Sequence, residues 1–424
     1  MQDRGNAMDT ADYKVLIIGG GASGMFAAAR LVKELGSGTD TAVIESGTRT
    51  GRKLLLTGSG RCNITNRHCI ISKYNTDDPV RLGKVLSGFN PSDTVDFFEN
   101  VLGVRITSKG DLYYPATFKS STVNDALRLY IEDAGTKIIT GSKAVSLVQT
   151  EEGFAVSLES GDVLTSKCVI LATGGASYPG TGSDGTGVSL PDGLIDPEDI
   201  IPFTPALVPL TSDKKILKQL AGIRCSCRTK VICGGKTEDT SEGEVLFTKE
   251  GGISGICIMD ISASVLRLLD SGKDVSVSLN LMQADADEAV NMLAVRRHLF
   301  GNRSCTDAFS GMIDRKILEA VMADMRIDPE STVSDLKDGR LIQLANALCG
   351  WEIPVNGCEG IDNAQVSCGG INLSALTDGL CAKEHRGLYV IGESCNVNGI
   401  CGGYNLQWAW ASAAAAVRDI ASYV

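Results

Sequence analysis

Fourteen cysteines are the side chains with the most obvious chemistry in this sequence, because thiols can bind metals, exchange disulfides or attack electrophiles. The tightest group is Cys225, Cys227 and Cys233. Its Cys-x-Cys-x5-Cys spacing matches no familiar zinc arrangement, and the three histidines lie far from it in the sequence. The first residues carry no apolar secretion signal. We therefore expect no metal site and a set of reduced thiols in a cytoplasmic protein.

Glycines near the start of the sequence predict a different chemistry, the binding of a dinucleotide. The segment KVLIIGGGASG places an apolar run directly before Gly19-x-Gly21-x-x-Gly24, and helix-forming residues follow. Gly19 permits a tight turn, Gly21 lets the backbone approach a pyrophosphate, and Gly24 lets helix and strand pack closely. Ala22 and Ser23 then lie at the positive end of the helix, where phosphates bind.

A carboxylate follows at the distance that a ribose contact requires. A second apolar run, TAVIE, ends in Glu45, 21 residues after Gly24, where it would accept hydrogen bonds from an adenosine ribose. Arg52 and Lys53 come next, followed by a second glycine turn that includes Gly60. This second polar segment suits FAD, because FAD is long and extends past the first helix. In simple NAD-binding domains the chain usually enters the next strand sooner.

Two later strands end in similar turns. CVILATGG brings Thr173 and Gly174 to the end of a buried strand, and GLYVIGE does the same for Gly392 and Glu393. A carboxylate at such a strand end can bind the ribityl hydroxyls of a flavin. The order of these four features in one chain is hard to obtain by chance.

The segment CNVNGICGGYNLQWAW predicts a glycine turn into a last helix. Gly402 and Gly403 form the turn, and Asn405 and Leu406 lie in the first helical residues. Apolar residues on nearly all faces predict a buried helix, whose positive N-terminus is expected to face the flavin. The 24 uncharged residues 394–417 are long enough to span a bilayer, but their amides and glycines make them too polar to do so.

These blocks resemble the FAD oxidoreductases of the glutathione reductase-like superfamily, and within it the bacterial YhiN/BaiN-like family. The matching blocks are IIGGGASG, GRKLLLTGSGRCNITN, LYYPATFKSSTVNDAL, ATGGASYPGTGS, LVPL, EVLFTKEGGISG, GLYVIGE and GICGGYNLQWAWAS. The resemblance implies an FAD site at the residues above and at Val145, with NADH or NADPH as a transient electron donor. It also implies an α/β fold, in which a Rossmann-like FAD-binding domain carries an inserted β-rich, barrel-like domain with a small helical subdomain.

Composition places the boundaries of these parts. We expect a loose tail over residues 1–12, the FAD-binding domain over 13–195 and 362–424, the inserted β-rich domain over 196–283 and 350–361, and a helical insertion over 284–349. GTGSDG, at 180–185, repeats the Gly-x-Gly-x-x-Gly spelling, but Pro179 stands where a strand should end. It therefore predicts no second dinucleotide site.

The resemblance favours NAD(P)H-driven reduction of a carbon–carbon double bond conjugated to a carbonyl, in an apolar steroid-like or bile-acid-like molecule. An amine oxidase that uses oxygen and an RNA-modifying flavoprotein remain as alternatives. Tyr178 and Tyr404 adjoin the glycine turns and could donate a proton, although aromatic packing is the commoner role. Cys62 is a weaker candidate, because the Cys62–Cys69 spacing does not match the Cys-x4-Cys of dithiol reductases and a plain buried thiol is favoured.

Charge argues against polyanionic partners. The 51 acidic and 40 basic residues give a net charge of −11, which repels phosphate backbones and anionic membranes. We find no basic run in the sequence that is long enough to override it. We therefore expect a small apolar substrate, with neither nucleic acid nor membrane as a partner.

Overall fold

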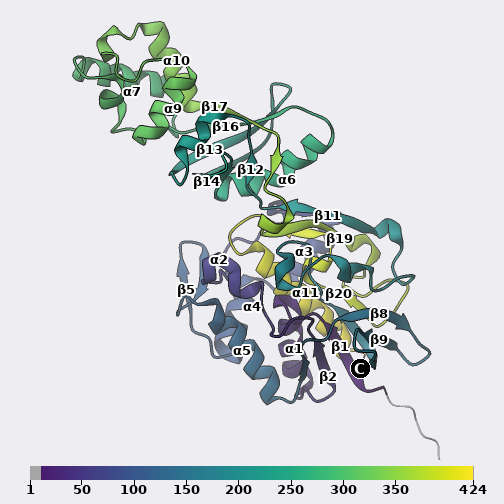
Figure 1. Cartoon of the computed structure of the whole chain (residues 1–424). Coiled ribbons are helices and arrows are strands. Elements are labelled where there is room, and N and C mark those ends of the chain that lie inside the picture. The colour runs from purple at the N-terminus through teal and green to yellow at the C-terminus, as the bar shows by residue number, and fades with distance from the viewer. Residues whose placement is uncertain (1–10, 424) are drawn as a thin grey trace, which may run out of the picture. The chain divides into compact units, whose positions relative to one another are not determined.

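The computed structural model describes residues 11–423 and divides them into two compact units, drawn in Figure 1. The first unit contains the described residues up to Thr204 and those from Val366 onward, and the second is Pro205–Gln365. These divisions, at 204/205 and 365/366, fall nine and four residues after the expected boundaries at 195/196 and 361/362. Most of the predicted tail lies outside the described residues. Within them, the Asp12 carboxylate accepts a hydrogen bond from the Thr165 backbone N–H at 2.9 Å.

A parallel sheet forms the centre of the first unit, because its short strands are apolar along nearly their whole length. The parallel strands lie in the order β7, β2, β1, β10, β20, and the antiparallel strands β9 and β8 continue from the first half of β10. In the register, Ile17 lies between Val43 and Ile170. The strands are β1 (Tyr13–Ile18), β2 (Thr41–Ile44), β7 (Lys137–Ile139), β8 (Ala144–Gln149), β9 (Phe154–Leu158), β10 (Val163–Leu171) and β20 (Leu388–Val390).

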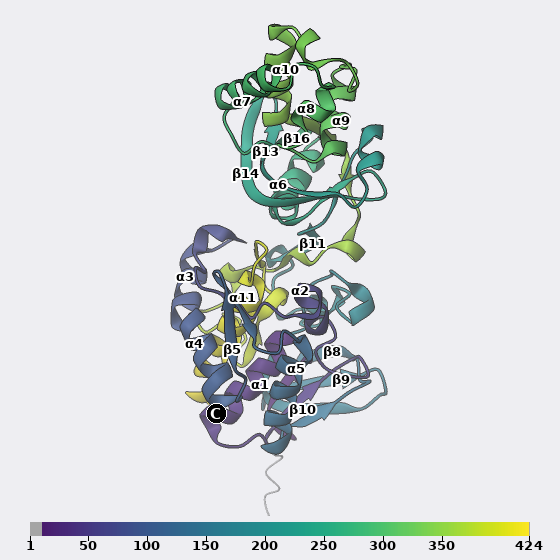
Figure 2. The same cartoon turned by 90° about the vertical axis from the view of Figure 1, so that its left-hand side faces the viewer.

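Helix α1 contacts both α5 and α11, and Figures 1 and 2 show these helices beside the parallel strands. Phe26 of α1 packs against Phe97 and Trp410 in a core of aromatic rings. Helix α11 is buried nearly all round, as its sequence predicts, with Trp408 and Trp410 almost fully buried. The helices of this unit are α1 (Ala22–Leu35), α2 (Thr57–Gly60), α3 (Pro79–Gly88), α4 (Pro91–Asp96), α5 (Ser120–Asp133) and α11 (Tyr404–Ala421).

Three small sheets complete the first unit and its connections. Strands β3, β6 and β5 form one, β4 pairs with β21, and β11 pairs with β19. Their bounds are β3 (Thr65–Asn66), β4 (Tyr74–Thr76), β5 (Ile106–Lys109), β6 (Leu112–Pro115), β11 (Ile200–Ala206), β19 (Val366–Ile371) and β21 (Val397–Gly399). Strands β3 and β21 both contact α11, so segments that are far apart in the sequence meet at the candidate site.

The second unit has its own apolar core and a sheet in the order β17, β16, β13, β14, β15, β12, β18. Alternating buried and exposed residues along β13 and β16 reflect a sheet with one face on the core. The strands are β12 (Leu210–Thr211), β13 (Arg224–Cys233), β14 (Lys236–Phe247), β15 (Ile253–Ser254), β16 (Val275–Asn280), β17 (Trp351–Val355) and β18 (Gly357–Cys358). Helix α6 (Ile256–Asp270) contacts this sheet. The segment predicted to be helical carries α7 (Ala286–Leu299), α8 (Cys305–Phe309), α9 (Arg315–Asp324) and α10 (Asp338–Cys349).

Candidate functional site

The turn from β1 into α1 contains three glycines of the motif, and a side chain at each would meet different surroundings. Gly19 has φ +113°, and a Cβ there would overlap the carbonyl oxygen of Ala172 at the end of β10. A Cβ on Gly24 would overlap the carbonyl oxygen of Gly19, so helix and strand are in contact. Gly21, in contrast, has no heavy atom within 4 Å of its would-be Cβ. The open space therefore lies directly at the N-terminus of the helix.

The Glu45 carboxylate at the end of β2 is buried and held by the backbone. Its Oε2 accepts a hydrogen bond from the Gly20 N–H at 2.9 Å, and its Oε1 accepts one from the Gly47 N–H at 2.6 Å. Nearby, the Arg52 guanidinium donates to the carbonyl oxygen of Gly180 at 2.5 Å, which fastens the loop after β10 over this edge. Two fixed N–H donors keep the carboxylate oriented. Ser46 Oγ makes a longer contact with Oε1 at 3.5 Å, and Oε2 retains a lone pair for a further donor such as a ribose hydroxyl.

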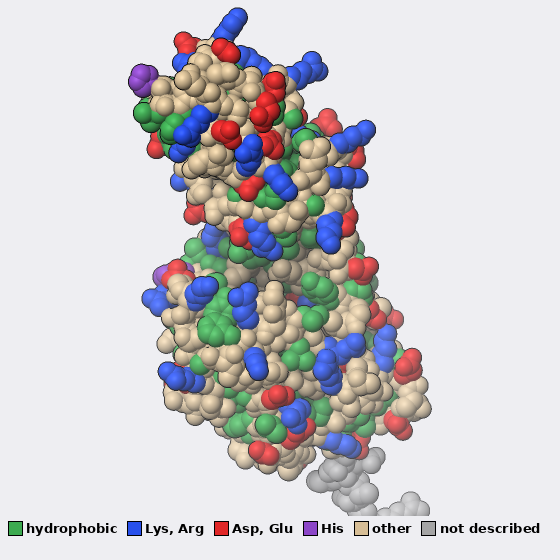
Figure 3. All heavy atoms as spheres, turned by 60° about the vertical axis from the view of Figure 1, so that its left-hand side comes forward, with side chains coloured by type: hydrophobic (Ala, Val, Ile, Leu, Met, Phe, Trp, Pro, Cys, Tyr) green, Lys and Arg blue, Asp and Glu red, His purple; other side chains and the backbone are tan. Residues whose placement is uncertain are grey.

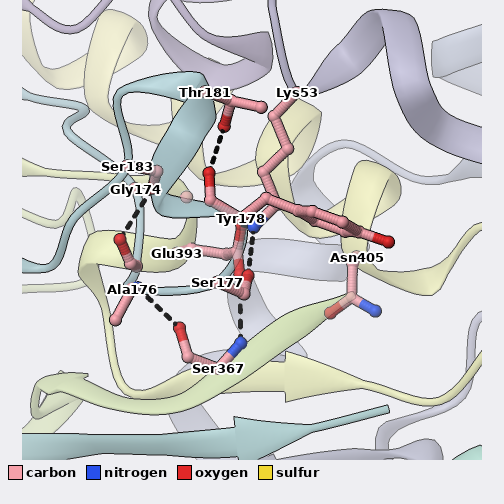
Figure 4. Close-up of polar contacts among 12 residues, drawn as sticks. Lys53, Gly174, Ala176, Ser177, Tyr178, Thr181, Ser183, Ser367, Glu393 and Asn405 are labelled. Carbon is pink, nitrogen blue, oxygen red and sulfur yellow. Dashed lines mark hydrogen bonds and ion pairs between the residues drawn. The ribbon is translucent and has the colours of Figure 1, made fainter. Parts of the chain in front are cut away.

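A polar cluster joins three loops that are far apart in the sequence. Lys53 Nζ lies 2.8 Å from Glu393 Oε2 and 2.5 Å from Ser177 Oγ, and Figure 4 shows the three side chains meeting. Glu393 Oε1 accepts a longer hydrogen bond, at 3.4 Å, from the Ser367 N–H. The Lys53 and Glu393 side chains are about a fifth exposed, so their ion pair is less screened than a surface pair. The cluster fixes the carboxylate in the turn after β20.

Helix α11 also holds the turn after β20 in place. Ser412 Oγ accepts a hydrogen bond from the Gly392 N–H at 3.0 Å, and Trp408 Nε1 donates to the Gly392 carbonyl oxygen at 2.9 Å. Ser394 Oγ, one residue past Glu393, accepts from the Gly174 N–H at 3.0 Å. The turns after β10 and β20 are therefore locked to each other and to the helix.

The N-terminus of α11 is a second glycine-led helix start. Gly402 and Gly403 have φ values of +103° and +91°. A Cβ on Gly403 would lie 2.7 Å from the carbonyl carbon of Thr65, and Asn66 Nδ2 donates to the Gly402 carbonyl oxygen at 3.0 Å. Asn405 Oδ1 accepts from a backbone N–H in the turn of β21 at 2.7 Å. Backbone contacts with β3 therefore fix where this helix begins.

These features fit an extended dinucleotide. Neither α1 nor α11 has a side-chain cap or an acidic residue in its first turn, so both positive helix ends are available to a ligand. The open space at Gly21 matches a pyrophosphate, Glu45 matches a ribose, and Glu393 matches the hydroxyls of a polyol chain. All three stand at the carboxyl ends of parallel strands, where α/β folds bind such ligands.

The structure places nearly all of the predicted cofactor residues at this edge of the sheet. They are Gly19, Gly21, Ala22, Ser23 and Gly24 after β1; Glu45, Arg52 and Lys53 after β2; Thr173 and Gly174 after β10; Gly392 and Glu393 after β20; and Gly402, Gly403, Asn405 and Leu406 at α11. Gly60 ends α2 with φ +83° and open space around it. Val145 lies half exposed on β8. The residue near it that contacts Glu45 is Ser142, whose backbone N–H donates to the Glu45 carbonyl oxygen.

The three candidates for catalysis differ sharply. Cys62 is fully buried in the apolar core, and burial raises the pKa of its thiol to about 12. Tyr404 is also buried, and its hydroxyl donates to the His68 carbonyl oxygen at 2.9 Å. Tyr178 is only half-buried, in the loop that carries Ser177. Reactivity at neutral pH is therefore not expected of Cys62, because the thiolate is the nucleophile.

Sequence reasoning missed the side chains that hold the predicted residues in place. Ser177 lies in a block that carried the family resemblance, but nothing marked it as the partner of Lys53. Ser367 and Ser412 come from β19 and the buried face of α11, and a serine in an apolar helix carries no signal of its own. Ser177 and Ser367 contact residues more than 100 positions away in the sequence, and Ser412 contacts a turn 20 residues before it, so only tertiary packing reveals these contacts.

A basic surface beside the site also escaped the analysis of the sequence. Residues 46–76 contain six lysines and arginines and no acidic residue, although the whole chain is acidic. Arg61 and Lys73 are exposed and form no ion pair within the described part of the chain. Arg67 pairs with Asp111 at 3.9 Å and lies over the ring of Tyr113, 5.9 Å from its centre. Figure 3 faces this side of the first unit, and lysine and arginine side chains are in view there between apolar ones.

The fold and the site together define an FAD-dependent oxidoreductase of the Rossmann type. The chain belongs to the HI0933-like family, since the HI0933-like protein Rossmann domain matches residues 13–419.

Two relatives cover almost the whole chain. A 3-dehydro-bile acid delta(4,6)-reductase from Clostridium scindens is 31% identical over 410 residues, 96% of this chain and 99% of that protein. A ribosomal RNA dihydrouridine synthase from Escherichia coli is 30% identical over 413 residues, 96% of this chain and 98% of that protein. The solved structure of 3-ketosteroid delta1-dehydrogenase from Sterolibacterium denitrificans aligns with 98% of this chain and 100% of that one, with a TM-score of 0.49 and 13% identity.

Residues 11–423 contain neither a metal-ligand cluster nor a membrane-spanning helix. Those residues contain no cluster of three or more histidine, cysteine or acidic side chains that could hold a metal ion. Across the same residues, no helix has the length and apolar character needed to cross a membrane.

Proposed function

We propose that the protein uses bound FAD and NADH or NADPH to reduce a carbon–carbon double bond conjugated to a carbonyl group. The observation that carries FAD binding is the open space at Gly21 beside the backbone-held Glu45 carboxylate, with a second uncapped helix end at α11. The reaction class is supported by the two relatives, whose names describe reductions of this kind. Both a delta(4,6) 3-oxo steroid and uridine contain a double bond conjugated to a carbonyl.

The residues of the chain bind and orient the cofactor in this proposal. The backbone N–H groups of Ala22 and Ser23 would receive the pyrophosphate, and Glu45 would accept hydrogen bonds from the ribose. Glu393, fixed by Lys53, would bind the polyol chain. When bound, the flavin supplies hydride chemistry. The positive end of α11 would then favour negative charge on the ring system.

A small apolar enone is the substrate class we favour. The bile-acid relative is 31% identical over nearly its whole length, and an enone of this type needs only an apolar site with a few polar groups. The net charge of −11 disfavours a long polyanion in general.

Uridine in RNA is a second candidate substrate, because a specific surface favours it. In the acid-free segment 46–76, Arg61, Arg67 and Lys73 flank β3 in the sequence, and β3 contacts α11. Exposed lysines and arginines of this kind attract phosphates. The RNA-modifying relative is 30% identical over 96% of this chain.

A stopped-flow experiment tests the proposal and separates the candidates. The FAD-loaded protein is mixed anaerobically with NADH or NADPH, and flavin absorbance is followed. We expect bleaching, then reoxidation by a steroid enone faster than by buffer alone. Failure of both nucleotides to bleach the flavin would contradict the proposal. Reoxidation by a uridine-containing RNA but not by the enone would transfer it to the second substrate, and bleaching by an amine without nucleotide would indicate the amine oxidase alternative.

We also infer that the protein works in the cytoplasm. The fourteen cysteines, which lie within the described residues, form no disulfide, and each is buried or half-buried. Free thiols persist in a reducing compartment. Thiol counting of protein purified without reductant tests this: fourteen thiols are expected after denaturation.

A further inference from the structure

We propose that Tyr178 is the acid that protonates the substrate carbon, and that Tyr404 has a purely structural role. This assignment rests on the proposed reduction of a conjugated double bond, for which hydride and proton must arrive from different groups. It is carried by the backbone of Tyr178, by the state of its hydroxyl, and by the engagement of the other candidate acids.

The backbone at Tyr178 is held in a conformation that its own side chain disfavours. Its φ is +54°, in the left-handed region, which is unfavourable for a residue with a Cβ. The Tyr178 carbonyl oxygen accepts hydrogen bonds from both the N–H and the Oγ1 of Thr181, each at 2.8 Å. The preceding residues are fixed as well, since the Ala176 N–H donates to Ser367 Oγ at 3.0 Å and Ser177 binds Lys53. Strain that the surroundings maintain is typical of functional positions.

The side chain that this turn presents is available for chemistry. Tyr178 is half-buried, and its hydroxyl makes no hydrogen bond to any residue in the described part of the chain. In Figure 4 the ring extends from the Lys53–Ser177–Glu393 cluster in the direction of Asn405, which lies in the first turn of α11. A phenol placed between the turn after β20 and the start of α11 stands where the proposal puts the reactive ring of the flavin.

The other candidate phenol, that of Tyr404, already forms contacts that stabilise the fold. Tyr404 is 6% exposed, and its hydroxyl donates to the His68 carbonyl oxygen at 2.9 Å. Its ring packs edge-on against Tyr74 at 5.5 Å, and the Tyr74 hydroxyl donates to the Tyr404 carbonyl oxygen. Releasing the Tyr404 proton to a substrate would break the contact that joins α11 to the loop after β3.

Other acids near the turns are unsuited for different reasons. Cys62 is fully buried, and Lys53 is engaged by both Ser177 and Glu393. Among the tyrosines and cysteine that the sequence marks, Tyr178 is therefore the one with an accessible, uncommitted proton.

In the proposed reduction, the conjugated double bond of the substrate receives a hydride and a proton from different groups. The double bond gains a hydride at its β carbon, with two electrons that come originally from the nicotinamide donor. It gains a proton at its α carbon from Tyr178 Oη, so one O–H bond breaks and one C–H bond forms. The phenolate then recovers a proton from water, which can reach a half-buried side chain. Protonation by a positioned acid contributes about 10²–10⁴-fold to such reactions.

The test compares Tyr178→Phe with Tyr404→Phe, which removes the same hydroxyl from the rival. Bleaching by NAD(P)H should proceed normally in both variants. Reoxidation by a steroid enone should be roughly 100-fold slower or more in Tyr178→Phe and within about 5-fold of the parent in Tyr404→Phe, as loss of a general acid predicts. Equal reoxidation rates in the parent and Tyr178→Phe would overturn the assignment while leaving the reductase function intact. An absence of enone-driven reoxidation in the parent would overturn the function itself and the assignment with it.

Two measurements that do not depend on turnover distinguish an acid from a structural residue. A saturated 3-keto steroid should bind Tyr178→Phe within about 2-fold of the parent affinity, since a proton donor to carbon makes no hydrogen bond to a saturated ligand. In thermal unfolding of the FAD-free protein, Tyr178→Gly should unfold at the parent temperature or above, because glycine accepts the positive φ without strain. A clear fall in ligand affinity in Tyr178→Phe would show that the hydroxyl hydrogen-bonds the ligand and would overturn its assignment as the acid for carbon. A clear fall in unfolding temperature in Tyr178→Gly would assign the ring to packing instead.

Discussion

The starts of helices α1 and α11 look alike in sequence but differ in what surrounds them. Each is led by a glycine, Gly21 or Gly403, and neither has a side-chain cap. Gly21 has φ −80°, a value open to any residue, and empty space around its would-be Cβ. Gly403 has φ +91°, and a Cβ there would lie 2.7 Å from the Thr65 carbonyl carbon. One glycine leaves room for a ligand, and the other allows two backbones to touch.

Because of this difference, a glycine replacement should affect cofactor binding at the start of α1 and protein stability at the start of α11, although both helix ends face the proposed cofactor. At α1, adding a side chain should fill ligand space without straining the protein. At α11, the same change should strain the protein before any ligand is present. The comparison therefore predicts opposite effects of glycine replacement on stability and on cofactor affinity.

The largest expected effect is on stability, at α11. Gly403→Ala should lower the free energy of unfolding of the FAD-free protein by about 2–5 kcal/mol, because left-handed strain adds to overlap with the β3 backbone. Gly402→Ala is the matched control. Its φ is +103°, but its nearest contact would be an ordinary 3.5 Å to Leu112, so about 1–2 kcal/mol is expected. Denaturant unfolding measures both, and equal losses in the two variants would contradict the role of the Thr65 contact.

The next effect is on affinity, at α1. Gly21→Ser should weaken FAD binding by roughly 100-fold, about 2.7 kcal/mol, because its side chain occupies the open space assigned to the pyrophosphate. The same serine is a favourable helix cap, so the FAD-free protein should be as stable as the parent or slightly more so. Fluorescence titration of FAD and unfolding of the FAD-free protein measure the two quantities. Full FAD affinity in this variant would remove the pyrophosphate from Gly21.

A smaller effect is expected at Glu45, beside the α1 end. Glu45→Gln keeps the shape of the side chain but replaces one of two carboxylate oxygens by an amide nitrogen. One of the contacts with the Gly20 and Gly47 N–H groups is then lost, and so is one acceptor for the ribose. We expect FAD affinity to fall about 10-fold, near 1.4 kcal/mol. The calorimetric enthalpy of FAD binding should fall in magnitude with it, and unchanged affinity would argue against a ribose contact.

The smallest effect is expected at Cys62, which precedes the strand that touches Gly403. Burial raises the pKa of this thiol from 9.0 to about 12, so it stays protonated in the folded protein at pH 7 to 9. Its contribution to stability is complete below pH 9, and it is lost as pH rises from 9 toward 12, because only the unfolded chain then releases the proton. Iodoacetamide labelling followed by peptide mass mapping should leave Cys62 unmodified at pH 8. Rapid labelling of native protein would place the thiol at an accessible site.

The sequence predicted the elements of the site better than their support. The strand, glycine and helix pattern around Gly19 and Gly24 is local, and the parallel sheet and the buried α11 were predicted correctly. Lys53 and Glu393 were each predicted to bind the cofactor, but nothing indicated that they form an ion pair, since 340 residues separate them in the chain. Ser367 and Ser412 carry no pattern because their roles depend on tertiary packing. The basic surface over 46–76 was hidden by averaging charge over the whole chain.

The pairing of β20 with β10 has a consequence for how the protein is made. The parallel sheet of the first unit includes residues 388–390, and α11 ends at Ala421, so this unit cannot close until nearly the whole described chain has left the ribosome. The second unit is continuous from Pro205 to Gln365 and has its own core, so it can fold while the first is still incomplete. The cofactor that we propose can then bind at the starts of α1 and α11 only after translation, and the apolar face of the early β1–α1 segment stays uncovered until then.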